Sequence, residues 1–127
     1  MRVEYYLHYA RPVKVVYAAD GRPEVYRFTR HTGRFERDDD LYGEIISSLG
    51  GETDAVDEDR FIQETEKLRA RYLHGDGPAF AVYDTIEAIT KAAQAEGRGL
   101  TPDEAALIRE LRRRTYALFE SEATPPR

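Results

Sequence analysis

The stretch from Val13 to Arg37, VKVVYAADGRPEVYRFTRHTGRFER, predicts two consecutive β-hairpins. Asp20-Gly21 favours the positive φ angles of a two-residue type I′ turn. Such a turn pairs Val15 with Tyr26, and side-chain alternation then predicts one apolar face and one more polar face. The predicted apolar face contains Val13, Val15, Tyr17, Tyr26 and Phe28, and the opposite face contains Lys14, Val16, Val25 and Arg27.

Two further segments complete the predicted sheet. Residues 3–9 alternate as a strand and precede a turn at Ala10-Arg11-Pro12. Thr32-Gly33 is a second turn signal, which folds residues 34–37 back onto the preceding strand. In the first strand, Val3, Tyr5, Leu7 and Tyr9 share one side. The sequence therefore predicts an N-terminal antiparallel β-meander of three or four strands.

After residue 37 the apolar period changes from two residues to about 3.6, which is typical of amphipathic helices. Four helices are expected: one between Asp38-Asp39-Asp40 and Gly50-Gly51, one that begins after Asp54 or Asp57 and ends near residue 73, one over about 79–96, and one that opens at the capping box Thr101-Pro102-Asp103-Glu104. Residues 52–57 read as an acidic connector. Helices of this length need a partner surface. The predicted fold class is α+β, in which the helices pack on one sheet face and on each other.

Composition limits the domain organisation and the chemistry. The chain of 127 residues predicts a single α+β domain over residues 1–120 and a frayed C-terminal tail over 121–127. It has no cysteine, which excludes disulfides and thiolate chemistry. Charged residues interrupt the N-terminal stretch, and no segment reaches the ~20 apolar residues of a membrane span. We therefore expect a soluble, cytoplasmic protein without a membrane partner.

The net charge of −5 conceals an asymmetry along the chain. Residues 1–37 carry eight basic and four acidic side chains, whereas residues 38–66 carry eleven acidic side chains and one arginine. The acidic segment either folds back near the basic sheet, or the two are separate solvated surfaces.

No motif for catalysis, a metal or a cofactor emerges from the sequence. Asp38-Asp39-Asp40 and Asp57-Glu58-Asp59 are carboxylate clusters, but helix capping explains both, and the spacing of a calcium loop is absent. His8, His31 and His74 share no ligand-like spacing. The loop 74–78 matches neither phosphate-binding fingerprint and predicts a turn. We assign no catalytic residue, no metal ligand and no cofactor.

The leading functional hypothesis is a non-catalytic, cytoplasmic protein-interaction module of the adaptor, inhibitor or immunity type. It would bind an oppositely charged protein partner through a Tyr/Arg-rich sheet face or through the acidic helical region. The candidate binding residues are Tyr6, His8, Lys14, Arg27, Arg30, Asp38, Asp39 and Asp40. Single-stranded nucleic acid binding by the basic aromatic face is the first alternative. Acid–base chemistry on a small molecule by a histidine and a carboxylate is the second, and homo-oligomerisation stays open.

Overall fold

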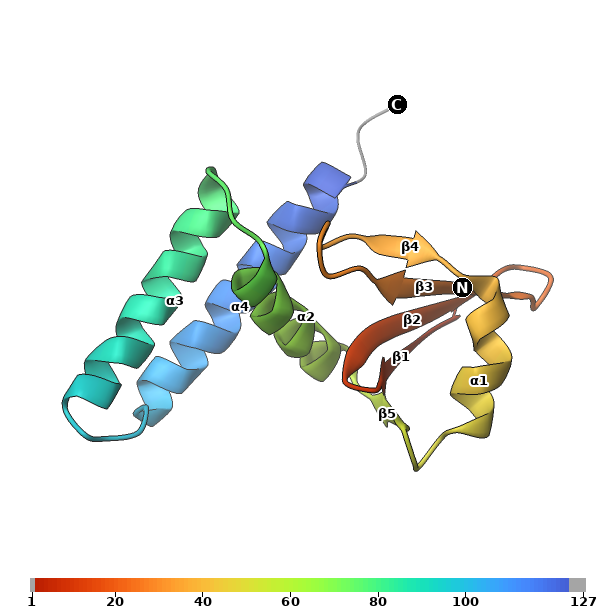
Figure 1. Ribbon diagram of the computed structural model, residues 1–127, viewed down its shortest axis with the longest axis horizontal. Helices are drawn as coiled ribbons and strands as arrows, with labels where there is room; N and C mark the ends of the chain where they lie inside the picture. Colours follow the sequence, from red (N-terminus) through yellow and green to blue (C-terminus); the bar gives the residue numbers. More distant parts are fainter. Residues whose placement is uncertain (1, 124–127) are drawn as a thin grey trace. The chain divides into compact units, whose positions relative to one another are not determined.

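The computed structural model describes residues 2–123, which belong to two compact units that meet in the sequence between Leu73 and His74 (Figure 1). The N-terminal unit contains a sheet and helices, and the C-terminal unit is a pair of helices, so the predicted α+β class is confirmed. The single domain over residues 1–120 stays a prediction. The predicted frayed tail begins inside the last helix, and its residues 124–127 lie outside the described part of the chain.

The N-terminal unit is built on an antiparallel sheet with the strand order β4-β3-β2-β1-β5. Its strands are β1 (Arg2–His8), β2 (Arg11–Tyr17), β3 (Pro23–Phe28), β4 (Phe35–Arg37) and β5 (Thr53–Val56). The first four strands form the predicted meander, and β4 pairs with β3 as the Thr32-Gly33 turn suggested. This part of the topology follows from turn residues between alternating segments.

The register between β2 and β3 differs from the prediction by one residue. Val15 pairs with Val25 rather than with Tyr26. The loop holds three residues instead of two, because the Ala18 amide donates to the Arg22 carbonyl at 2.9 Å and Gly21 has a φ of 85°. Such a loop is the type I turn followed by a left-handed residue. A one-residue shift turns every β3 side chain to the other face, so the predicted grouping of Tyr26 and Phe28 with Val15 is wrong.

Two further corrections concern β1. The first turn consists of Tyr9 and Ala10, because His8 pairs with Arg11, and not of the predicted Ala10-Arg11-Pro12. Residues 53–56, predicted as part of an acidic connector, form the edge strand β5 antiparallel to β1. The pairing with β1 satisfies the backbone hydrogen-bonding groups of this short segment. Its acidic composition gave no indication of a strand.

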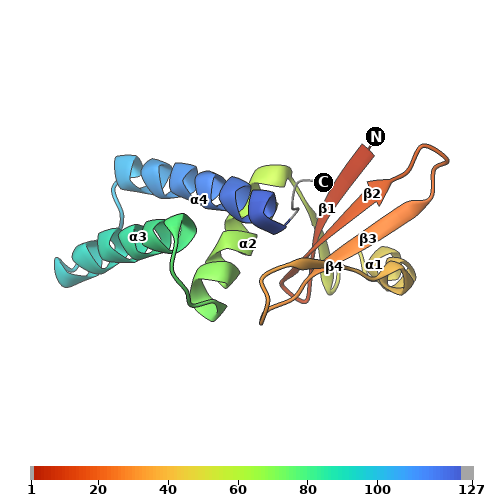
Figure 2. The same cartoon turned by 90° about the horizontal axis from the view of Figure 1, so that it is seen from above.

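Helices cover both faces of the sheet rather than one (Figures 1 and 2). The 3₁₀ turn η1 (Asp39–Leu41) and helix α1 (Tyr42–Ser47) lie on one face, where Ile45 packs into the first core. That core consists of Tyr6, Val13, Val15, Val25 and Ile45, flanked by Tyr17, Leu41 and Tyr42. The observed register creates it, because it places Val25 beside Val13 and Val15.

Helix α2 (Glu58–Tyr72) covers the opposite face. Asp57 is its N-cap and accepts a hydrogen bond from the Arg60 amide at 2.8 Å, which selects Asp57 from the two predicted caps. Phe61 is fully buried between Tyr5 and Phe35, at ring-centroid distances of 4.8 and 5.4 Å. The β3 side chains that the register turns away from the valine core therefore meet a second apolar layer.

The C-terminal unit consists of α3 (Pro78–Ala95) and α4 (Pro102–Ala123). The predicted capping box is confirmed: the Glu104 amide donates to Thr101 Oγ1 at 3.1 Å, and the Thr101 amide donates to Glu104 Oε1 at 2.9 Å. A hydrogen bond from Arg98 and then the Thr101 amide lower the pKa of Glu104 to about 2. None of the helices in residues 2–123 has the length and apolarity that crossing a membrane requires.

Candidate functional site

The turn between β1 and β2 is strained and exposed. Tyr9 and Ala10 have φ angles of 49° and 63°, and they are the non-glycine residues with positive φ in the described chain. This conformation costs roughly 1–2 kcal/mol for a residue with a Cβ. The Tyr9 amide donates to the Glu52 carbonyl at 2.8 Å, and the Tyr9 side chain is 69% exposed. Strain that surrounding contacts maintain is characteristic of functional positions.

Ala10→Gly tests that strain. Glycine adopts the left-handed conformation without a steric cost, so we expect the free energy of unfolding to rise by about 1 kcal/mol. Ala19 lies in the next hairpin loop without a positive φ, so the control Ala19→Gly should lower stability by about 0.4–1 kcal/mol through unfolded-state entropy. Urea denaturation of both variants measures the two values. Equal losses in both would show that the turn is not strained.

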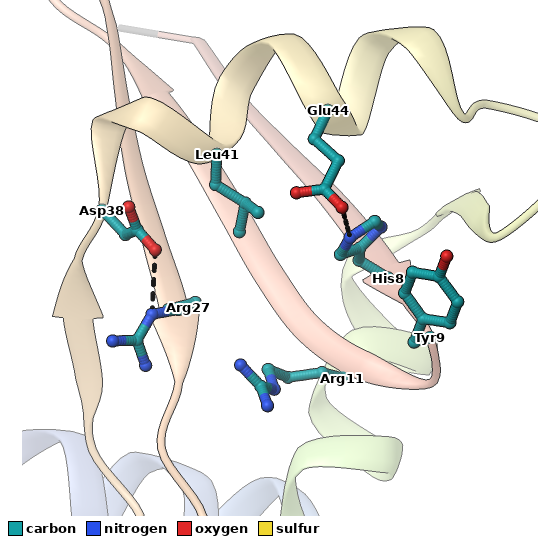
Figure 3. A pocket seen from close by; sticks show the side chains of 7 residues that line it. All are labelled: His8, Tyr9, Arg11, Arg27, Asp38, Leu41 and Glu44. Carbon is teal, nitrogen blue, oxygen red and sulfur yellow. Dashed lines mark hydrogen bonds and ion pairs between the residues drawn. The ribbon is translucent and has the colours of Figure 1, made fainter.

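A cavity of about 390 Å³, the His8–Glu44 cavity, opens on the α1 side of this turn (Figure 3). It is lined by His8, Tyr9, Arg11, Arg27, Asp38, Leu41 and Glu44. His8 is almost fully buried, with Nδ1 at 2.5 Å from Thr53 Oγ1 and Nε2 at 3.5 Å from Glu44 Oε1. Both ring nitrogens therefore have protein partners, which fixes the ring as part of the scaffold.

The charges in the His8–Glu44 cavity largely neutralise one another. Arg27 Nε donates to Asp38 Oδ2 at 3.0 Å, and Glu44 is placed against His8. Arg11 extends toward the middle of the opening, and within residues 2–123 it has no ion pair (Figure 3). Two guanidinium groups beside two carboxylates, with Arg27 already paired to Asp38, make a weak site for an anion.

A second cavity, of about 380 Å³, lies on the α2 side and shares Tyr9 and Arg11 with the first. We call it the arginine cavity; its lining is Tyr9, Ala10, Arg11, Phe28, Arg30, Leu68, Arg71 and Tyr72. The guanidinium carbons of Arg30 and Arg71 lie 5.2 and 5.5 Å from the centroid of the Tyr72 ring. Arg30 Nη1 also donates to the Tyr72 hydroxyl at 3.5 Å. Tyr72 thus gathers two cations that are far apart in the sequence.

The arginine cavity differs from the rest of the unit in its charge. None of the described residues that line it is acidic, and Arg30 and Arg71 have no ion pair within residues 2–123. Elsewhere on the sheet, Arg27 pairs with Asp38, and Arg37 pairs with Asp39 at 2.6 Å. Hydrogen bonding to Asp39 is the first cause that raises the pKa of Arg37. The chain neutralises those arginines and leaves the cavity cationic.

The residues predicted to bind a partner are distributed over several environments. Tyr6 and His8 are buried, and burial followed by the hydrogen bond to Glu4 raises the pKa of Tyr6 to about 12. Lys14 points to the α2 side, with Nζ at 5.7 and 5.4 Å from the rings of Tyr26 and Phe35, whereas Arg27 lies on the α1 side. Asp38 and Asp39 pair with Arg27 and Arg37, and Asp40 is exposed. The predicted open cationic face that unites Lys14 with Arg27 is therefore not formed.

Of the predicted binding residues, Arg30 is the one in the arginine cavity. Sequence reasoning missed Arg71 and Tyr72, because both fall at the predicted end of a helix near residue 73 and nothing distinguishes them from their neighbours. Tyr9 was placed at the end of a strand, because the turn was predicted one residue later, at Ala10-Arg11-Pro12.

Metal chemistry has no geometric basis in the described part of the chain, where no three histidine, aspartate or glutamate side chains form a group that would hold an ion. Comparison of the chain with family models, curated proteins and solved structures finds no match.

Proposed function

We propose that the N-terminal unit is a non-catalytic protein-interaction module that binds an anionic segment of a partner protein at the arginine cavity. The observation that carries this proposal is the pair of exposed guanidinium groups, Arg30 and Arg71, held over Tyr72 without a carboxylate partner within residues 2–123. Arginine and tyrosine are enriched at protein interfaces, and guanidinium groups bind carboxylates and phosphates through paired hydrogen bonds.

Binding is favoured over catalysis by the partners of His8. Thr53 and Glu44 lie against its two ring nitrogens, and the ring is almost fully buried, so little of it faces a substrate. A protein partner is favoured over single-stranded nucleic acid because helices cover both faces of the sheet (Figure 2). A stacking platform for bases needs an open face.

Charge reversal on α2 tests the proposal. Arg71→Glu is expected to weaken binding of a short fluorescent peptide rich in aspartate and glutamate by about tenfold or more at low salt, because it removes a charged hydrogen bond and adds repulsion. Arg60→Glu makes the same change of charge near the other end of α2, roughly 16 Å away at 1.5 Å per residue, and should leave the affinity nearly unchanged. Fluorescence anisotropy measures both.

Arg30→Glu should reproduce the effect of Arg71→Glu, because the two guanidinium groups share one ring. Wild-type protein that binds no anionic peptide, neither one rich in aspartate and glutamate nor a phosphorylated one, would contradict the proposal. Equal losses in Arg60→Glu and Arg71→Glu would also contradict it, since they would indicate attraction to the unit as a whole. Thermal melts followed by circular dichroism show whether each variant is folded.

A further inference from the structure

We infer that the anionic group bound by the arginine cavity is the phosphate ester of a phosphorylated tyrosine in the partner protein. This inference rests on the proposed function and names the ligand of the same site. It draws on three properties of the cavity: the guanidinium groups of its lining, the aromatic and apolar parts of its lining, and the charged groups beside it.

The guanidinium groups of Arg30 and Arg71 belong to the lining of one cavity. Arg30 and Arg71 lie within 5.2 and 5.5 Å of the same ring centroid, and Arg11 borders the cavity. A carboxylate carries one charge and two acceptor oxygens, which one arginine fork satisfies. A phosphate monoester carries about −1.5 to −2 charges and three acceptor oxygens at neutral pH. Two arginine forks in the lining of one cavity therefore offer more donors than a carboxylate can accept, and they suit a phosphate better.

The remaining lining suits a ring attached to that phosphate. Leu68 and Phe28 provide apolar atoms, and Tyr9 is an exposed ring at the mouth. Aromatic rings prefer offset-stacked or edge-to-face contacts of the kind Tyr9 and Tyr72 offer. The volume of about 380 Å³ falls within the roughly 300–1,000 Å³ of small-molecule pockets, whereas a bare oxyanion needs less space. A phosphorylated tyrosine supplies both the phosphate and the aromatic ring from a single side chain.

The surroundings favour an isolated phosphate over a polynucleotide. Two carboxylates, Glu44 and Asp38, and two arginines, Arg11 and Arg27, line the adjoining His8–Glu44 cavity. A nucleic acid strand with one phosphate in the arginine cavity would need further cationic positions for its next phosphates, and the charges of the adjoining His8–Glu44 cavity largely neutralise one another. Like charges repel, and nucleic acid binding depends on neutralising several phosphates in a row. A side-chain phosphate in a peptide meets only the cationic cavity.

Peptides that differ at one residue test the inference by fluorescence anisotropy. A peptide that is neutral apart from a central phosphotyrosine is expected to bind about tenfold or more tightly than the same peptide with glutamate at that position, because the phosphate accepts more charge-assisted hydrogen bonds than the carboxylate. The versions with tyrosine and with phosphoserine should bind more weakly than phosphotyrosine, since the first lacks the charge and the second lacks the ring. An oligothymidine is the nucleic acid probe.

Arg71→Lys distinguishes the effect of the paired guanidinium donors from the effect of the positive charge. Lysine keeps the positive charge but lacks paired donors, so we expect the phosphotyrosine peptide to lose most of its advantage over the glutamate peptide, while the peptide rich in aspartate and glutamate still binds. Arg60→Lys is the matched control on the same helix and should preserve the advantage. Persistence of the full advantage in Arg71→Lys would overturn the inference.

The other results separate the inference from the proposed function. Equal affinity for phosphotyrosine and glutamate peptides, or for phosphotyrosine and phosphoserine peptides, would overturn the inference and leave the proposed function standing if the acidic peptide binds. Tighter binding of oligothymidine than of the phosphotyrosine peptide would overturn it in favour of nucleic acid. If neither the acidic nor the phosphotyrosine peptide binds, both proposals fall.

Discussion

Arg69→Ala is expected to lower the free energy of unfolding by about 3–5 kcal/mol, because it removes one member of a buried ion pair. The Arg69 and Glu66 side chains are fully buried, and Arg69 Nη1 lies 2.8 Å from Glu66 Oε2. Arg69 Nε also donates to the Gly33 carbonyl at 2.9 Å. The change therefore removes the link between α2 and the β3–β4 loop as well as the ion pair. Chemical denaturation with the linear extrapolation measures the loss.

Two comparisons identify the cause of that loss. Arg69→Met combined with Glu66→Leu removes both charges and should recover much of the stability, since replacing a buried pair by apolar side chains is often neutral or stabilising. The exposed pair of Lys67 and Glu64, on the same helix at 3.2 Å, provides the control: Lys67→Ala should cost less than about 1 kcal/mol. A double variant as unstable as Arg69→Ala would mean that the broken charge balance of the buried ion pair is not responsible.

The strands of the meander could be predicted because each carries its own alternation, but the register between them could not. Asp20-Gly21 is compatible with a two-residue and a three-residue loop, since both place glycine at a positive φ. The choice depends on long-range packing: the observed register puts Val25 against Val13 and Val15 in a core completed by Ile45 from α1. A single residue of loop length thus decided which side chains face α1 and which face α2.

The candidate site could be predicted only in part, because it too depends on contacts between residues far apart in the sequence. The basic character of residues 1–37 pointed to Arg30. Its partner Tyr72 is 42 residues later, and no local periodicity connects a hairpin loop with the last turn of a helix. The strain at Tyr9 and Ala10 was also hidden, because the β1–β2 turn contains neither glycine nor asparagine and the bond from Tyr9 to Glu52 depends on the unpredicted strand β5.

Phe61→Ala is expected to lower the free energy of unfolding by about 3–5 kcal/mol, the range for truncating a buried phenylalanine. Phe61 is the ring that joins α2 to the sheet, since it contacts Tyr5 of β1 at 4.8 Å and Phe35 of β4 at 5.4 Å. Its removal leaves a cavity between α2 and the sheet, bordered by Tyr5 of β1 and Phe35 of β4. The surrounding backbone cannot fill this cavity without moving α2. The loss therefore measures how much the second apolar layer contributes.

Phe61→Leu and Ile46→Ala are the controls for this prediction. Leucine keeps most of the apolar volume and should cost less than about 1.5 kcal/mol. Ile46 is 42% exposed on α1, so its truncation should change stability by less than about 0.5 kcal/mol, as for other surface positions. A cost below about 1 kcal/mol for Phe61→Ala would be incompatible with this burial. It would mean that α2 does not pack firmly against this face of the sheet. The arginine cavity would then not be held in place, because α2 contributes Leu68, Arg71 and Tyr72 to its lining.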